Sequence, residues 1–157
     1  MNDALSVMPP TNLPAPIARG KIMAIQRACQ ALPDGQRIDE SPPLKHLIAP
    51  GVYAREIHLA AGTLVVGRVH RHRHLNIISQ GRITCYTEFG LETIEAPASF
   101  VSEPGTKRVV LTHEDAIWTT IHPNPTDETD VSKLEEMFTA AEYEELGMEV
   151  SNLKELE

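Results

Sequence analysis

The most chemically suggestive segment of the chain is GRVHRHRHLN, residues 67–76, which holds three of the seven histidines and three arginines. Imidazoles bind metals or transfer protons near neutral pH, and guanidinium groups bind carboxylates and phosphates. Alternate residues of an extended chain lie on one face. A strand here would therefore place five polar side chains in a single space: Arg68, His70, His72, His74 and Asn76.

The sequence around this segment predicts the strands that would position it. From residue 52 onward, short apolar segments alternate with turn dipeptides such as Ala61-Gly62, Gln80-Gly81 and Pro104-Gly105. Many short strands at nearly even spacing, without helices between them, indicate an antiparallel sandwich or barrel. The expected strands are Val52–Ala60, Thr63–Val69, Leu75–Ser79, Ile83–Thr87, Leu91–Glu95, Ser99–Ser102, Lys107–Leu111 and Ala116–His122.

Helical patterns are confined to the two flanks of this region. Residues 1–20 are rich in proline and alanine and predict an extended arm. Lys21–Leu32 has apolar residues at helical spacing, and Pro33 ends that helix. Residues 34–43 are expected to form a loop.

A second helix is expected near the C-terminus. Asp130 is the predicted N-cap, and Gly147 is the predicted stop. Its apolar stripe is expected to dock onto the barrel or a sister subunit, with the acids on its solvated face. The stripe consists of Val131, Leu134, Met137, Phe138, Ala141 and Leu146.

At 157 residues the chain is expected to form one globular domain. Its parts are an N-terminal arm and helix (1–45), a barrel (46–125) and an acidic helix and tail (126–157). No apolar run is long enough to span a membrane, and no signal peptide pattern is present. Cys29 and Cys85 are far apart in sequence, which predicts a cytoplasmic protein without a disulfide framework.

Acidic residues are concentrated at the C-terminal end. The chain has a net charge of −8, but residues 127–157 alone carry eleven acids against two lysines. The rest of the chain is close to neutral, and residues 67–76 are locally basic. No basic stripe or aromatic stacking set accompanies them, which argues against a double-stranded nucleic acid partner. A small anionic molecule fits this charge distribution better.

Glycine and histidine spacing resembles the first motif of the cupin superfamily. Gly62 is followed after five residues by Arg68-Val69-His70, then after three by His74, and after six by Gly81. In a weaker second motif, Gly105 and Arg108 stand at the expected glycine and histidine positions. The resemblance covers about residues 50–122 and extends to small cupin-like proteins of tailed bacteriophages. It implies a double-sheet jelly roll with a site inside one end of the barrel.

At three of the four positions that hold a metal in many cupins, this chain differs from the superfamily. Arg68 and Arg108 replace histidines, His74 replaces a glutamate, and only His70 is retained. Arginine cannot ligate a metal. The resulting set predicts a metal-independent pocket for a phosphate- or nucleotide-like anion bound by Arg68, His70, His74, Asn76 and Arg108. His70 and His74 would be the acid–base pair if the protein is an enzyme.

The leading alternative is a metal site built on His70 and His74. His113 and His122 are the candidate further ligands, and Asp115 or Glu114 would instead supply a carboxylate. Inward-facing arginines would favour the anion. An inward His113 with both arginines outside would favour the metal.

The third hypothesis is a non-enzymatic phage assembly or host-interaction module, located in a bacterial host cell. The exposed arm and the helix stripe predict a homo-oligomer, taken as a dimer. His72 is expected to lie in a turn. His122 shares a face with Trp118 and Thr120, although the direction of that face is not readable from the sequence.

Overall fold

Two antiparallel sheets dominate the computed structural model, which describes residues 13–33 and 43–153. The larger sheet has the strand order β1-β2-β10-β5-β8, and the smaller has the order β3-β9-β6-β7. The strands of the larger sheet are β1 (Leu44–Ala49), β2 (Gly51–Leu59), β5 (His74–Gln80), β8 (Ala98–Ser102) and β10 (Ala116–Asn124). The strands of the smaller sheet are β3 (Leu64–Val66), β6 (Arg82–Thr87), β7 (Gly90–Glu95) and β9 (Val109–Thr112).

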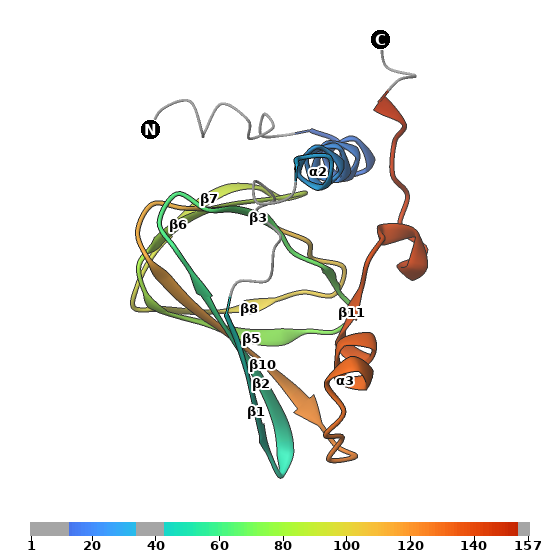
Figure 1. Cartoon of the computed structure of the whole chain (residues 1–157). Helices are drawn as coiled ribbons and strands as arrows, with labels where there is room; N and C mark the ends of the chain where they lie inside the picture. The colour runs from blue at the N-terminus through green and yellow to red at the C-terminus, as the bar shows by residue number, and fades with distance from the viewer. Residues whose placement is uncertain (1–12, 34–42, 154–157) are drawn as a thin grey trace.

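The chain passes repeatedly from one sheet to the other (Figure 1). From β2 it crosses to β3, returns to β5, crosses to β6 and β7, returns to β8, crosses to β9 and ends in β10. This order is that of a double-sheet jelly roll. The expected all-β jelly roll with a helix on each flank is therefore confirmed.

Alternation along the strands divides the buried side chains between two cores. Val110 of β9 points between the sheets, together with Ile78 and Trp118. Val109 and Leu111 point outward, toward helix α2 (Ala15–Gln30). The side-chain period of two in a strand thus builds a barrel core and a separate core beneath the helix.

Helix α2 lies across the smaller sheet (Figure 1), where Ala18, Ile22 and Met23 are buried. It begins at Ala15, six residues before the expected start, so the prediction of an extended arm was wrong for the segment from Ala15 onward. Proline is tolerated in the first helical turn, and burial of Ala18 stabilises that turn. The rest of the predicted arm, residues 1–12, and most of the predicted loop, residues 34–42, lie outside the described residues.

The C-terminal helix is shorter than expected. Asp130 caps α3 (Val131–Phe138) as predicted, and its carboxylate accepts the Ser132 and Lys133 N–H groups. The helix ends at Phe138 because β11 (Thr139–Ala140) pairs with β4 (Val69–His70). A 3₁₀ turn, η1 (Tyr143–Leu146), follows and ends at Gly147, whose φ is +71°.

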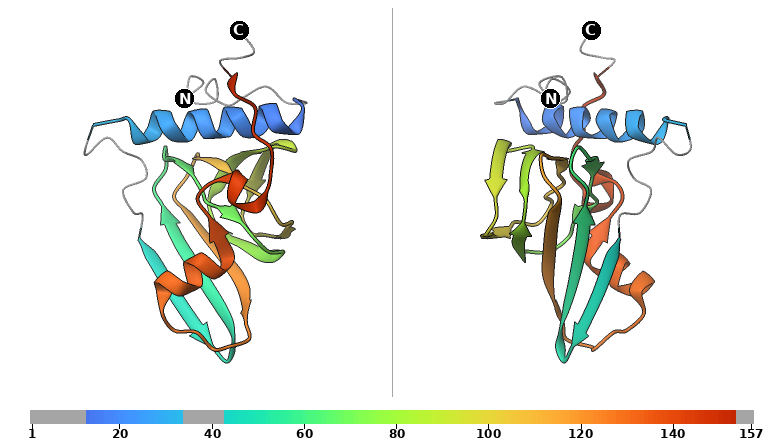
Figure 2. Two further views of the ribbon diagram at one scale, coloured as in Figure 1. Left: turned by 90° about the vertical axis from the view of Figure 1, so that its right-hand side faces the viewer. Right: turned by 60° about the vertical axis from the view of Figure 1, so that its left-hand side comes forward.

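The expected docking of the apolar stripe onto the barrel is observed at α3, where Leu134 and Phe138 are buried against Tyr53 of β2. The segment after η1 continues past α2 (Figure 2). There the Ser151 N–H donates to the Pro16 carbonyl oxygen at 3.0 Å. Within the described residues, no helix is both long enough and apolar enough to cross a membrane.

One other prediction of local structure was wrong, and one strand was not predicted. The strand expected at Thr63–Val69 is divided into β3 and β4. Gly67 interrupts it and donates its N–H to the Arg108 carbonyl oxygen at 2.9 Å. Strand β1 was not predicted, and it pairs with β2 along its whole length, from Leu44 opposite Ile57 to Ala49 opposite Val52.

Candidate functional site

Three histidines from β4, β5 and β10 meet at one end of the barrel. The candidate ligand atoms of His70, His74 and His122 all lie within 4.8 Å of one another. Among the described residues this is the one group of three or more potential metal ligands. The pairing of Leu75 with Ile121 brings His74 and His122 together, because their neighbours in sequence are partners on adjacent strands of the larger sheet.

The hydrogen bonding of His74 defines which of its nitrogens is free. Its Nδ1 lies 3.0 Å from the His72 carbonyl oxygen, which can only accept, so Nδ1 carries the proton. The lone pair is therefore on Nε2. That atom is buried and has no hydrogen-bond partner of good geometry in the described part of the chain, although the Asn76 side chain is near enough to raise the pKa of His74. Nδ1 of His70 and Nδ1 of His122 are likewise without a partner among the described residues. Three orphaned imidazole nitrogens in one place are unusual, because buried polar atoms are normally satisfied.

Aromatic packing holds these imidazoles in position. The rings of His70 and His74 are stacked, with centroids 4.1 Å apart and an interplanar angle of 23°. The His122 ring lies between His74, at 4.8 Å, and Phe138 of α3, at 4.6 Å. Because a metal lies in the plane of each imidazole that binds it, the stacked pair cannot bind one ion until one ring turns.

Burial keeps all three histidines neutral at physiological pH. Desolvation lowers the pKa of His122 to about 3, with further contributions from His74 and Arg55. Desolvation and the neighbouring histidines likewise place the pKa of His70 well below its usual value. Burial also lowers the pKa of His74. A neutral imidazole can bind a metal or accept a proton, whereas it is a poor proton donor.

A cavity of about 100 Å³ lies inside the barrel next to the histidines. Its polar lining includes three arginines, Arg55, Arg68 and Arg108, together with His70 and Asn76. Arg55 was missed by the sequence analysis. It lies opposite Thr120 on β10, which in turn lies opposite Asn76 on β5. The three residues form one row across the sheet, and all three line the cavity.

A hydrogen-bonded network fixes the floor of this cavity. The Arg108 Nη2 donates to Ser102 Oγ at 2.7 Å, and the Asn76 Nδ2 donates to the same oxygen at 2.8 Å. The Trp118 Nε1 donates to Asn76 Oδ1 at 3.0 Å. The Arg108 guanidinium also lies over the Trp118 ring, 5.6 Å from its centroid, and over the Phe100 ring. These contacts leave Arg108 oriented before any ligand arrives.

The other predicted residues lie outside the histidine cluster. His72 is exposed in a bend, as expected for a turn residue. His113 is absent from the histidine cluster, and its Nε2 lies 2.6 Å from Thr84 Oγ1 on the smaller sheet. Asp115 accepts the Ala61 N–H through its carboxylate, and Glu114 is exposed. Arg68 lines the cavity but is largely exposed, and its Nε donates to Thr139 Oγ1 at 2.8 Å.

The histidine cluster fits a transition metal by the chemistry of its donors. Imidazole nitrogens suit zinc, copper, iron and nickel. A metal-binding histidine usually donates its other N–H to a carbonyl or carboxylate, as His74 does to His72. His70, His74 and His122 would hold the ion. The nearby guanidinium groups oppose a bare dication, and a bound anion would offset that repulsion.

Comparisons with known proteins give similarity at the level of solved structures. No protein-family model matches the sequence, and no curated protein matches it. Similar structures include a double-stranded β-helix domain protein from Klebsiella pneumoniae, at 14% identity, covering 57% of this chain and 83% of that one (TM-score 0.48). A cupin-2 domain protein from Shewanella frigidimarina shows 10% identity, covering 62% and 98% (TM-score 0.43). A cupin domain from Bordetella pertussis shows 15% identity, covering 54% and 97% (TM-score 0.41).

The jelly-roll assignment rests on the strand order of this chain rather than on those similarities. The resemblance to tailed-phage proteins stays a prediction.

Proposed function

We propose that the protein binds a divalent transition metal through His70, His74 and His122 and takes a small anionic ligand into the adjoining cavity. The observation that carries this proposal is the set of three buried imidazole nitrogens without partners, one of which has its tautomer fixed by the His72 carbonyl. An unsatisfied buried polar group costs about 1–3 kcal/mol. Once the His70 or His74 ring turns out of the stacked arrangement, metal coordination would satisfy all three nitrogens together.

The anionic ligand is the expectation from sequence that the charges of the cavity support. Three guanidinium groups line it, and the described residues of the lining include no carboxylate. Arg108 is held by Ser102 and the aromatic rings, so it offers an oriented fork to carboxylate or phosphate oxygens. The metal is positively charged and the anion negatively charged. Binding of either ligand is therefore expected to strengthen binding of the other.

Two functions proposed from sequence change under this reading. His70 and His74 become metal ligands, and a role for either as an acid is disfavoured by their lowered pKa values. Of the metal set predicted as an alternative, His70, His74 and His122 are retained and His113 is replaced by solvent or ligand. Whether the site turns over its ligand, and whether the chain dimerises, stay predictions.

The decisive experiment measures metal content in protein purified without an affinity tag or chelator. Near-stoichiometric zinc, iron, manganese, nickel or copper is expected in the wild type. His74→Ala is expected to lower metal affinity by about 100-fold or more, since it removes one of three ligands. His113→Gln is the matched control and should retain the metal, because His113 contacts Thr84 on the smaller sheet and is not part of the histidine cluster. Metal far below stoichiometry in the wild type, after incubation with each ion, would refute the centre.

The anion is tested separately by calorimetry with inorganic phosphate, a nucleoside monophosphate and a dicarboxylate, with and without metal. Arg108→Gln should weaken binding by about tenfold or more, whereas Arg73→Gln should not, because Arg73 is exposed and paired with Glu103. No binding of any of these anions at pH 6 or pH 8 would refute the anionic ligand while leaving the metal centre intact.

A further inference from the structure

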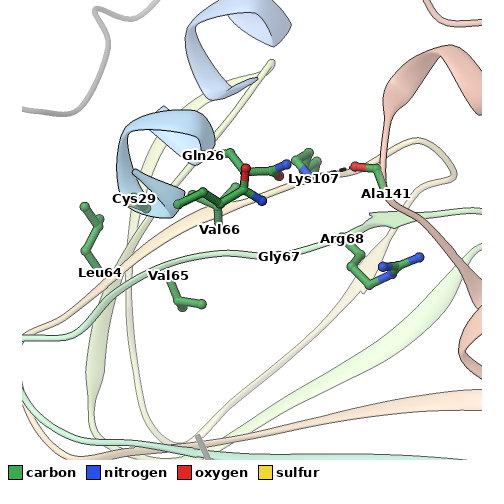
Figure 3. A pocket seen from close by; sticks show the side chains of 10 residues that line it. Gln26, Cys29, Leu64, Val65, Val66, Gly67, Arg68, Lys107 and Ala141 are labelled. Atoms are coloured by element: carbon green, nitrogen blue, oxygen red, sulfur yellow. Dashed lines mark hydrogen bonds between the residues drawn. The ribbon is translucent and has the colours of Figure 1, made fainter. Parts of the chain in front are cut away.

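A second cavity, with both apolar and polar residues in its lining, lies outside the barrel between helix α2 and strand β3 (Figure 3). Its volume is about 160 Å³. Gln26 reaches it from the helix, and Arg68 and Lys107 reach it from the segments that follow β3 and precede β9. Among the described residues that line this α2–β3 cleft, none carries a carboxylate.

Lys107 is the unusual member of the cleft. Only 2% of its surface is exposed. Its Nζ donates to the Ala141 carbonyl oxygen at 3.2 Å, as Figure 3 shows. Within the described chain, no carboxylate lies within ion-pair distance of this ammonium, and the exposed Glu142 compensates its charge only from farther away. Burying an ammonium without a counter-ion is costly, and one carbonyl satisfies only one of its three N–H groups.

Strand alternation separates this cleft from the barrel. Lys107 precedes Arg108, and the two side chains point to opposite sides: Arg108 into the barrel cavity and Lys107 toward the helix. The α2–β3 cleft is therefore distinct from the cavity at the histidine cluster, although Arg68 borders both.

We propose that the α2–β3 cleft is a second binding site, for a small oxyanion held between Lys107 and Arg68. The anion would act as the counter-ion of Lys107, which has no carboxylate within ion-pair distance among the described residues. The volume is sufficient for inorganic phosphate or a short carboxylate. Gln26 would donate from its amide to a further oxygen. This inference is independent of the metal centre.

The test compares Lys107→Met with the wild type by calorimetry and thermal melting in phosphate and in acetate. Methionine preserves the length and much of the volume of lysine without its charge. We expect the variant to melt at a higher temperature than the wild type in anion-free buffer, because an uncompensated buried charge is removed. We also expect its affinity for the anion to fall by about tenfold or more. Lys133→Met, on the exposed face of α3, is the matched control and should change neither quantity.

Variants of the two cavities locate any anion that binds. Gln26→Leu removes the amide donor of the α2–β3 cleft without removing a charge and should also weaken binding there, whereas Arg108→Gln should leave it unchanged. Absence of phosphate and acetate binding in the wild type would overturn the proposal. So would retention of full affinity in both Lys107→Met and Gln26→Leu. Loss of all anion binding in Arg108→Gln alone would assign the anion to the barrel and likewise overturn it.

Discussion

The histidine end of the barrel and the α2–β3 cleft contain buried groups that lack opposite kinds of partner. At the histidine end, three imidazole nitrogens have no hydrogen-bond partner among the described residues, while the neighbouring cation Arg108 is held by Ser102 and aromatic rings. In the cleft, the ammonium of Lys107 has a carbonyl partner but no counter-ion in the part of the chain that the structure describes. We therefore expect the first region to bind a Lewis acid and the second to bind an anion.

This difference arises from the type of residue that is buried rather than from the sign of the regional charge. Both cavities are lined by basic residues and both are bordered by Arg68. Desolvation lowers the pKa of the histidines far enough to remove their charge at neutral pH. Desolvation lowers the pKa of Lys107 only to about 8, so most of its charge remains. Similar burial therefore leaves the histidines uncharged and the lysine charged, which is the basis for proposing a metal at the first and an anion at the second.

The sharpest separation of the two regions is expected from Phe138→Ala. Phe138 is 4% exposed, and its ring stacks on His122. Its truncation should lower the free energy of unfolding of the metal-free protein by about 4 kcal/mol. It should also weaken metal binding, because His122 loses its support. Anion binding in the cleft should survive, since the β11–β4 pairing still positions Ala141. Urea unfolding and parallel metal and phosphate titrations measure these effects; equal losses at both sites would show that they are coupled.

The converse variant is Ile22→Ala, at the buried face of α2. Ile22 is fully buried in the core beneath the helix. We expect a loss of about 3 kcal/mol in unfolding free energy and a helix that no longer holds Gln26 over the cleft. Phosphate affinity at the cleft should fall while metal content stays at the wild-type level. A metal loss in this variant would contradict the independence of the two cores.

Of the two regions, only the histidine end is expected to lose stability when the pH is lowered from 7 to 5. The pKa of His122 is about 3 in the folded state and near 6.5 in the unfolded chain, so the unfolded state binds more protons between these values. Stability therefore falls as the pH is lowered, by about 2 kcal/mol between pH 7 and pH 5 for His122 alone. His70 and His74, whose pKa values are also lowered, add to this loss.

Urea unfolding of metal-free protein at several pH values measures this loss, and His122→Phe should reduce it. Lys107 gives the same sign in a different window. Its folded pKa is about 8 and its usual value is 10.5, so it makes stability rise with pH only above about 8. A pH profile that stays flat from pH 7 to pH 5 would contradict neutral buried histidines.

Local patterns predicted those parts of the fold that depend on neighbours in sequence. The bend at His72 and the cap at Asp130 follow from spacing and residue type, whereas the single face expected for Arg68 to Asn76 is broken at that bend, because His70 ends β4 and His74 begins β5. The face shared by Trp118, Thr120 and His122 was also readable. Its inward direction was not, because that depends on which sheet covers it, and strand order is set by contacts far apart in sequence.

Long-range pairing accounts for the features that the sequence did not predict. The C-terminal helix stops at Phe138 because Thr139 pairs with His70, a partner far away in sequence. The same pairing places the Ala141 carbonyl beside Lys107. Nothing in the local sequence around Lys107 distinguishes it from an exposed strand lysine. Its burial becomes visible only when α2 and the segment after β11 are placed over it.

The smallest effect is expected from Asp130→Ala, which tests how far the support of the histidine end extends. The Asp130 carboxylate is exposed and accepts the N–H groups of Ser132 at 3.0 Å and Lys133 at 3.3 Å. Loss of this N-cap should cost about 1 kcal/mol and fray the first turn of α3. Asp130→Asn should restore most of it, because asparagine caps equally well. Metal affinity should fall slightly and the cleft should be unaffected, since α3 carries Phe138 over His122 but does not line the cleft. Calorimetric unfolding and metal competition measure both quantities. If the alanine variant weakened phosphate binding as much as metal binding, α3 would be supporting both sites through the segment that follows it.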